Sequence, residues 1–437
     1  MPPAWRVPDR CGKLPAMPRS LRRAICLALL AACSRAPAPA DRPAAAAAPA
    51  ARATGAPAQP TPPRSGHAQA PAPAPKTAGA ARPAPCLPGE PYAAAVALVD
   101  EAQSALDANA PERALACADE ALRLSPRLVP GLVARGDALA ARGRIDDARL
   151  AYARALAIDP DDPEALHGAA ELHIRHLDGS REALETGLEY ALRGARAATL
   201  RKDRDLAASL ELVAGMAEND LGRSHLALPH LERAAQARPD DPDVAYERGV
   251  ALFELCRFPE AQRAFERALQ LAPDDPWTLH QLGLLAERRG DERRAGQLLT
   301  KARKLAPQDF RSELPVDPGA FKAEVQAAVA GLPEPEKRAL HGVPLEIQDL
   351  PDSADLLAVD PPLSPTILGL FRGPAEDEPC TPADGPSCRS IVLYRKNLLR
   401  FARDRRELSE QVRITLLHEL GHLHGESDED LRARGLE

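Results

Sequence analysis

The chain has few aromatic side chains, no excess of positive charge and no long hydrophobic run. Phe, Trp and Tyr together make up 3% of its 437 residues, and the formal net charge is -7 at pH 7. Because nucleic acids are bound by basic surfaces and stacked aromatic rings, this composition argues against a nucleic-acid partner. No segment reaches the roughly 20 apolar residues of a membrane-spanning helix, so attachment to a membrane would need another device.

The first residues carry the pattern of a secretion signal. A basic segment at residues 19–23, downstream of an internal Met17, precedes the apolar run Ala24–Leu30 and the small residues before Cys33. The end of this stretch, LAAC, resembles the lipobox of bacterial lipoproteins. That resemblance implies that residues 1–33 are a signal peptide and that Cys33 is lipid-modified. An ordinary cleaved signal or a short anchor is the alternative.

These features predict a cell-envelope protein on the periplasmic side, held to a membrane by lipid only. Ser34, directly after the lipidated position, favours the outer membrane over the inner one. Several acyl chains would be needed, because one chain binds only marginally. Residues 34–90 are almost entirely Ala, Pro, Gly and Thr with scattered Arg. Such a stretch cannot bury a core, so we expect a disordered tether there.

The middle of the chain repeats every 34 residues. Gly215, Gly249 and Gly283 are each followed by Ala at the twelfth residue and Pro at the twenty-fourth, and Gly136 begins a similar unit. These offsets resemble the tetratricopeptide repeat, which implies a mostly α fold, an α-solenoid over residues 91–309. The unit between Pro163 and Ala207 is too long, so we expect an insertion or lengthened helices there. The resemblance implies a concave surface for a protein or peptide partner; a spacer or brace is the alternative.

The strongest chemical signal is the run HELGHLHGESD near the C-terminus. His418 and His422 stand four residues apart, so on a helix both rings project from one face and can bind one metal ion. Glu419 then lies beside the place of a metal-bound water. Gly425 lets the helix end, and the returning chain can bring Asp428 as a third ligand. Three protein ligands leave one position open for water, as in catalytic zinc sites.

The residues before this run support a helix. Val412, Leu416, Leu420 and Leu423 form an apolar stripe beside the face that carries the histidines. The alternative is two solvated histidines on an amphipathic terminal helix. His424 and Glu426 are rival ligands that rank below Asp428. His424 lies two residues after His422, so on a continuing helix its side chain points away from the metal face. His173 and His176 also lie close together, but no third ligand accompanies them.

Residues from about 321 to 437 resemble the bacterial minimal zincin-like metallopeptidases. The matching stretches are ILGLFRG at 367–373, IVLYRKNLLRFA at 391–402 and ELSEQVRITLLHELGHLHGESDEDL at 407–431. The resemblance implies that His418, His422 and Asp428 bind zinc and that Glu419 is the base. One departure is that members of the family usually carry a second His and an aromatic residue after the motif, whereas this chain reads Leu423, His424, Gly425.

The implied chemistry is peptide-bond hydrolysis with Zn²⁺ as cofactor. Zinc lowers the pKa of a bound water, and Glu419 takes its proton and passes it to the leaving amine. Tyr394 and Arg395 are candidates for stabilising the oxyanion, although the ordinary interpretation of both is an edge-strand residue.

Cys380 and Cys388 flank a turn-rich segment before the strand that leads to the motif. In an oxidising periplasm we expect them to form a disulfide. Two free thiols are the alternative, and a zinc site is disfavoured because no matching Cys or His pair has the required spacing.

We therefore expect a tetratricopeptide solenoid followed by a small α+β zincin-like domain over residues 310–437. Its elements should be a helix near Phe321–Ala330, strands near Leu345–Ile347 and Ser390–Tyr394, and the metal-binding helix last. Two functions fit: a lipid-anchored envelope metallopeptidase whose repeats recruit a protein substrate or partner, or a non-catalytic scaffold with a metal-binding module.

Overall fold

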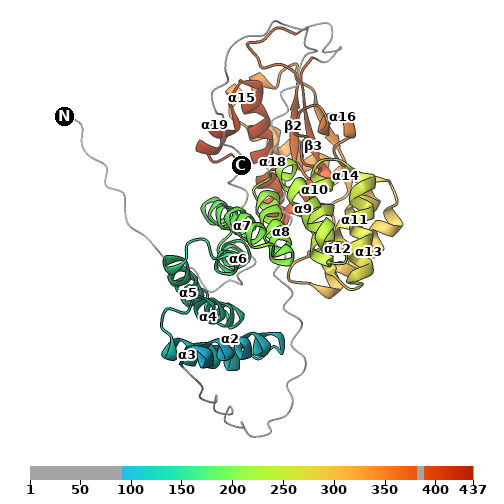
Figure 1. Ribbon diagram of the computed structural model, residues 1–437. Helices are drawn as coiled ribbons and strands as arrows, with labels where there is room; N and C mark the ends of the chain where they lie inside the picture. Colours follow the sequence, from blue (N-terminus) through green and yellow to red (C-terminus); the bar gives the residue numbers. More distant parts are fainter. Residues whose placement is uncertain (1–90, 381–387, 437) are drawn as a thin grey trace, which may run out of the picture.

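A computed structural model describes residues 91–380 and 388–436 of the chain (Figure 1). The predicted signal peptide, the lipidation of Cys33 and the tether at 34–90 lie outside the described residues. Across the described part, no helix combines the length and apolar character needed to cross a membrane.

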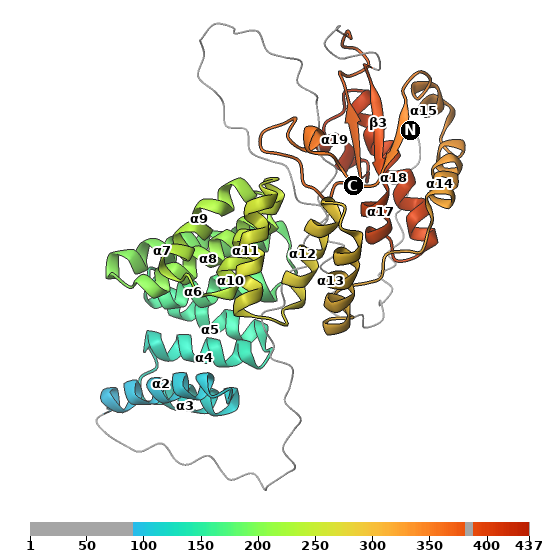
Figure 2. The same ribbon diagram turned by 90° about the vertical axis from the view of Figure 1, so that its right-hand side faces the viewer.

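The first described part is a stack of antiparallel helix pairs, which confirms the expected α-solenoid. Figure 2 shows the pairs following one another from α2 and α3 at one end to α12 and α13 beside the C-terminal part. The regular pairs are α2 (Pro91–Asp107) with α3 (Pro111–Leu124), α4 (Val129–Ala141) with α5 (Ile145–Ile158), α8 (Arg204–Asp220) with α9 (Ser224–Ala237), α10 (Pro242–Glu254) with α11 (Phe258–Leu271), and α12 (Pro276–Arg288) with α13 (Glu292–Leu305).

The repeat glycines let the two helices of a pair approach closely. A Cβ atom on Gly249 would lie 2.5 Å from the ring of Phe265 on the partner helix, well inside van der Waals contact. Gly136 meets Tyr152 in the same way, with the same separation of 16 residues. The period read from the sequence is therefore a packing period, in which a large side chain on one helix fills the space above a glycine on the other.

Replacing Gly249 with Ala should destabilise the protein by about 1–3 kcal/mol, because the added methyl group has no room and the Phe265 ring must move. Gly296 provides a matched control, since it lies in α13 with nothing within 4 Å of an added Cβ. Gly296→Ala should instead stabilise by roughly 0.5–1 kcal/mol through helix propensity. Urea unfolding of both variants measures the difference, and equal effects would contradict the packing argument.

The atypical unit has a lengthened second helix, which is one of the two possibilities expected from the sequence. Its first helix α6 (Pro163–Glu171) continues into a π-helical turn, η2 (Leu172–His176), and its second helix α7 (Arg181–Arg201) has 21 residues where α5, α9, α11 and α13 have 14. Gly187 on α7 faces Ile174 of the π-helical turn at a distance that leaves no space for a Cβ atom. Gly187 thus lets α7 approach the π-helical turn closely.

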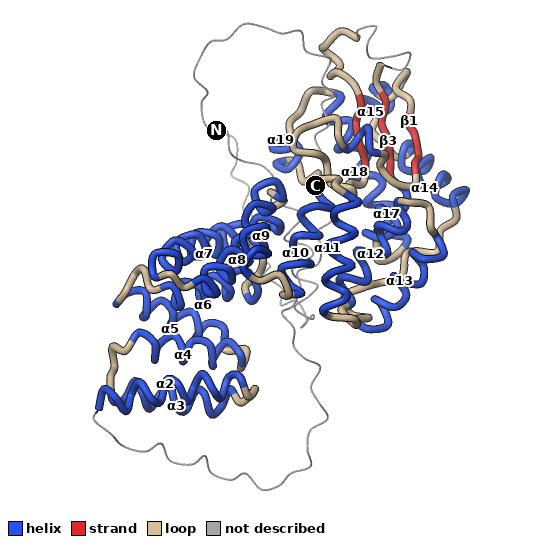
Figure 3. Tube along the Cα trace, turned by 45° about the vertical axis from the view of Figure 1, so that its right-hand side comes forward, coloured by secondary structure: helices blue, strands red, loops and turns tan. Residues whose placement is uncertain are grey.

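The C-terminal part contains a three-stranded sheet with helices around it (Figure 3). Its elements are α14 (Pro318–Ala330), α15 (Glu334–Ala339), β1 (Leu345–Gln348), α16 (Ser353–Leu356), β2 (Gly369–Arg372), β3 (Ser390–Tyr394), α17 (Arg395–Phe401), α18 (Arg405–Leu423) and α19 (Asp428–Ala433). The strand order is β1-β3-β2, with β1 parallel and β2 antiparallel to β3. Both predicted strands are present, whereas β2 was not predicted.

One face of the sheet packs on α18. Phe371 and Ile391 form an apolar cluster with Leu416 and Leu420 of that helix. Because side chains alternate along a strand, the next residues of β2 and β3 point to the opposite face. There Leu370 joins a separate cluster with neighbouring β3 residues.

Two details of the prediction are wrong. Tyr394 is not an edge-strand residue, since β3 is the central strand and the Tyr394 side chain is fully buried. Sequence alternation identifies a strand but says nothing of its place in the sheet. The metal-binding helix is also not the last element, because the short helix α19 follows it and begins at Asp428.

The solenoid and the C-terminal part pack against each other, a point that the sequence left open. Cys256, in the turn after α10, and Phe258, the first residue of α11, pack against the apolar cluster on the far face of the sheet. Beside it, the buried Glu287 of α12 pairs with both Lys396 and Arg400 of α17, with 3.2 Å between the Lys396 Nζ atom and the nearer carboxylate oxygen. The last repeats therefore form one wall of the C-terminal domain.

Candidate metal centre

The helix α18 carries the motif residues on its buried side. It begins after Asp404, whose side chain accepts a hydrogen bond from the backbone of Glu407 and so caps the helix. Val412, Leu416 and Leu420 anchor it in the domain core, as the apolar stripe predicts. This anchoring holds the adjacent face, with both motif histidines, in the protein interior.

The structure brings His418, His422 and Asp428 together. The Nε2 atoms of the two histidines lie 3.0 Å apart, and the Oδ1 atom of Asp428 lies 3.5 Å from His418 and 3.4 Å from His422. Two ligands bound about 2.0–2.1 Å from a tetrahedral zinc ion are themselves about 3.3 Å apart. The spacing of these three atoms thus suits one shared metal ion, and among the described residues this is the group of His, Cys, Asp and Glu side chains that could hold one.

Backbone carbonyls orient both imidazole rings. The Nδ1 atom of His418 donates to the carbonyl of Leu436 at 2.6 Å, and that of His422 donates to the carbonyl of Glu426 at 3.0 Å. With both rings neutral, each Nε2 atom therefore turns its lone pair toward the other, and either a proton on one of them or a metal ion between them relieves the repulsion. Such second contacts also fix the tautomer that binds a metal.

The electrostatics of the cluster favour a positive charge. Burial would raise the pKa of Asp428, but the two neighbouring histidines outweigh it and lower this pKa to about 2. Burial would likewise lower the pKa of His418, but Asp428 and Glu419 outweigh it and raise this pKa to about 9. The same environment that attracts a proton here would attract a divalent cation.

Glu419 lies beside the three potential ligands, and its carboxylate is both buried and unpaired. Its side chain is fully buried, and neither carboxylate oxygen has a hydrogen-bond partner. Burial raises the pKa of Glu419 above its ordinary value. An unpaired carboxylate in the interior is costly, and this one lies directly beside the three side chains that could bind a metal ion.

The turn after α18 brings Asp428 back to the histidines. Gly425 has a φ of 80°, a left-handed conformation that reverses the chain after the last helical turn. Ser427 then caps α19, and the capping box that it forms with Asp430 holds Asp428 at the first position of that helix. This return is what the spacing of Gly425 and Asp428 predicts.

Three further positions support the site and were not predicted. Gly369 of β2 lies against α18, where a Cβ atom would come within 2.6 Å of Thr415 and 3.0 Å of the Glu419 carboxylate. Gly421, inside the motif, leaves space for Leu431 of α19. Leu436 orients His418 through its backbone only. The glycine inside HELGH was a visible signal for close packing, whereas a backbone carbonyl leaves no trace in a sequence.

The other predicted candidates are engaged elsewhere. The Nδ1 atom of His424 donates to Glu376 at 2.9 Å, and the Glu426 carboxylate pairs with Arg434, so neither rival ligand joins the cluster. The oxyanion candidates also point away from it. Tyr394 donates its hydroxyl to Asp355 at 3.0 Å on the sheet face opposite α18, and Arg395 pairs with Asp349 at 2.7 Å.

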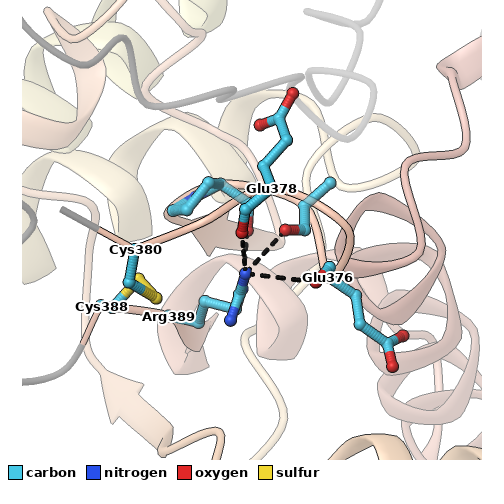
Figure 4. The surroundings of a disulfide bond; sticks show 7 residues. Glu376, Glu378, Cys380, Cys388 and Arg389 are labelled. Atoms are coloured by element: carbon cyan, nitrogen blue, oxygen red, sulfur yellow. Dashed lines mark hydrogen bonds between the residues drawn. A yellow bond between two sulfur atoms is a disulfide. The ribbon is translucent and has the colours of Figure 1, made fainter.

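Cys380 and Cys388 are joined by a disulfide, with Cα atoms 5.8 Å apart (Figure 4). The bond closes the connection between β2 and β3. Neither sulfur atom is therefore a free thiol or a zinc ligand in this structure.

Comparisons with known proteins agree with this division of the chain. Residues 340–436 match the family model of zincin-like metallopeptidases, while residues 136–176 and 212–276 match models of the TPR or tetratricopeptide repeat. The C-terminus is thus a zincin-like metallopeptidase domain preceded by TPR repeats. The zincin-like family implies zinc binding, and repeats of this type serve protein–protein interaction.

Solved structures are similar at low identity. One is pilF of Pseudomonas aeruginosa, with 16% identity and a TM-score of 0.44 over 54% of this chain and 100% of that chain. Another is a thermophilic TPR protein of Thermus thermophilus, with 25% identity and a TM-score of 0.34 over 42% of this chain and 93% of that chain. No curated protein matches the chain significantly.

Proposed function

We propose that the protein is a zinc-dependent metallopeptidase that hydrolyses peptide bonds in a protein recruited by its repeats. The observation that carries this proposal is the convergence of His418, His422 and Asp428 at ligand spacing, with the unpaired carboxylate of Glu419 beside them. Three protein ligands leave a tetrahedral ion one open position, which distinguishes catalytic from structural zinc sites.

Different residues of the chain would bind the metal ion and transfer the proton during hydrolysis. When bound, zinc supplies a Lewis acid that lowers the pKa of water and polarises a carbonyl group. His418, His422 and Asp428 would hold it, with the rings oriented by the carbonyls of Leu436 and Glu426. Glu419 accepts the proton of the attacking water, since burial keeps its pKa above that of an ordinary carboxyl group, and returns that proton to the leaving amine.

The position of the edge strand β2 beside Glu419 favours a peptide as the substrate. β2 is an edge strand, and its Gly369 lies against Glu419. An edge strand has unpaired backbone groups that can bind an extended peptide by adding it as a further strand. A peptide bound along β2 would run past the carboxylate that acts as the base.

The repeats and the leader give the finer part of the proposal. We infer that the solenoid recruits the protein substrate or a partner and that Cys33 is lipidated, placing the enzyme in the cell envelope on the periplasmic side. The Cys380–Cys388 disulfide supports such a location, because disulfides persist in oxidising compartments. The outer membrane is favoured because Ser34 follows the lipidated position.

A second candidate function is a scaffold that binds metal without cleaving. The observation that favours it is the engagement of both oxyanion candidates elsewhere, Tyr394 with Asp355 and Arg395 with Asp349. A peptidase without an oxyanion donor would rely on the metal ion alone for that role.

Zinc content and cleavage of an unfolded protein, measured together, distinguish the two candidate functions. The purified protein should contain about one zinc ion per chain and should cleave an unfolded protein such as reduced, carboxymethylated casein. Treatment with 1,10-phenanthroline should abolish cleavage, and added Zn²⁺ should restore it. Stoichiometric zinc without cleavage of any unfolded protein would support the scaffold, and a protein that binds no zinc would contradict both.

A further inference from the structure

The connection between β2 and β3 is tied together at its base by one arginine. Arg389 follows Cys388 and donates hydrogen bonds across the connection to several backbone carbonyls of the facing limb, residues 374–378 (Figure 4). The distances are 2.9 Å to Pro374, 2.7 Å to Ala375 and 2.6 Å to Glu378, with a longer contact of 3.5 Å to Glu376. A guanidinium group has enough donors for this task, and a lysine has one donor centre only.

The limb that Arg389 holds lies on the last turn of the metal-binding helix. The backbone N–H of Glu376 donates to the carbonyl of Leu423 at 2.6 Å, which satisfies one of the unpaired carbonyls at the end of α18. Ala375 is buried and lies 3.7 Å from the position of a Cβ atom on Gly425. The contact between Glu376 and His424 adds little, because both side chains are exposed.

The segment that begins at this contact carries the rest of the metal site. Immediately after Leu423 the chain turns at Gly425, orients His422 through the carbonyl of Glu426 and then supplies Asp428. A shift at the end of α18 would move both the orienting carbonyl and the third ligand. The anchored limb is thus connected to the ligands by a few residues of chain.

We propose that Arg389 is a positioning residue for the metal site, and that the Cys380–Cys388 disulfide keeps it in place. Arg389 holds limb 374–378 on the end of α18, the limb fixes the turn at Gly425, and the turn sets Glu426 and Asp428 against the histidines. The disulfide joins the two limbs next to Arg389 and so restricts their separation. The inference rests on the proposed metal binding.

The test is the affinity of the full chain for metal. Outer contacts that orient metal ligands typically contribute 10- to 100-fold to affinity. Because Arg389 acts on the ligands through the limb and the turn, Arg389→Ala should raise the zinc dissociation constant by a factor near the lower end of this range, about 10-fold, measured by competition with a chromophoric chelator. It should also alter the visible absorption of the Co²⁺-substituted protein, which reports ligand geometry. Arg389→Lys should recover only part of the affinity.

Arg413→Ala is the control, since Arg413 is an arginine on the metal-binding helix α18 that pairs at the surface with Glu410 and, among the described residues, makes no contact with the metal ligands. It should leave affinity and spectrum unchanged. Cys380→Ser/Cys388→Ser is the second probe and decides the matter if Arg389→Ala does not fold; it should weaken metal binding in the same direction.

The outcomes are distinct. If these variants lower the thermal stability of the metal-free and metal-loaded protein equally and leave affinity and the cobalt spectrum unchanged, the residue is merely structural and the inference is overturned. If the wild-type protein binds zinc but cleaves nothing, the proposed peptidase function fails while the positioning role is still decided by affinity. If the wild-type protein binds no zinc, the proposed function and the positioning role both fail.

Discussion

Glu419→Gln should reduce peptide hydrolysis by about 100- to 10,000-fold while the protein still binds one zinc ion. General bases contribute rate factors of this size, and glutamine matches the shape of glutamate but cannot accept the proton. The buried position of Glu419, apart from the ligand group, means that the substitution removes the base without removing a ligand. Initial rates on an unfolded protein substrate, together with metal analysis of the same samples, measure both quantities.

The loss of activity in Glu419→Gln should appear in kcat and not in KM. The proton transfer occurs in the transition state, so kcat should fall and KM should change little. Glu410→Gln is the control, because Glu410 lies on the same helix as Glu419 but at the surface, where it pairs with Arg413. It should retain full activity. A Glu419→Gln protein that cleaves at the wild-type rate would show that another group acts as the base or that hydrolysis occurs at another site.

Asp428→Ala should raise the zinc dissociation constant by at least about 100-fold. Contacts that merely orient a ligand contribute up to this factor, and Asp428 is proposed as a ligand itself. The substitution also removes the negative charge that favours a cation beside His418 and His422. The helix α19 should persist, because its capping box is formed by Ser427 and Asp430.

Chelator competition measures the affinity, and thermal unfolding with and without zinc measures its link to stability. Zinc should raise the melting temperature of the wild-type protein and have little effect on the variant, since binding to the folded state alone is stabilising. The neighbouring Glu429, which is exposed, provides the control. Unchanged affinity in Asp428→Ala would remove the third ligand from the proposed site and with it the argument for a catalytic zinc centre.

Elements that depend on contacts between residues close in the sequence could be predicted, whereas elements that depend on contacts between distant residues could not. The repeat units were recognisable because Gly249 and Phe265 stand 16 residues apart and touch directly, so packing is recorded as a fixed spacing. The strand β2 was missed because it has four residues and begins with Gly369, a residue disfavoured in strands. Its glycine is explained only by the proximity of α18, about fifty residues later in the chain.

In the candidate site, too, the local features could be predicted and the long-range ones could not. The face shared by His418 and His422, the adjacent Glu419 and the turn at Gly425 follow from helix geometry, and the structure places them as that geometry predicts. Tyr394 was considered either as a residue that stabilises the oxyanion or as an ordinary edge-strand residue. The structure puts it in the central strand with its hydroxyl on Asp355, because strand order depends on the whole sheet.

By itself, the sequence determined the elements whose contacts are local: a helix with two imidazoles on one face, a turn that brings a carboxylate back, and a repeat with a regular helix spacing. Only the tertiary structure decided what holds them in place. The carbonyl of Leu436, the glycine at 369, the limb held by Arg389 and the wall formed by Glu287 come from distant parts of the chain. Side-chain spacing along a helix is set by backbone geometry, whereas contacts between elements depend on how all of them pack.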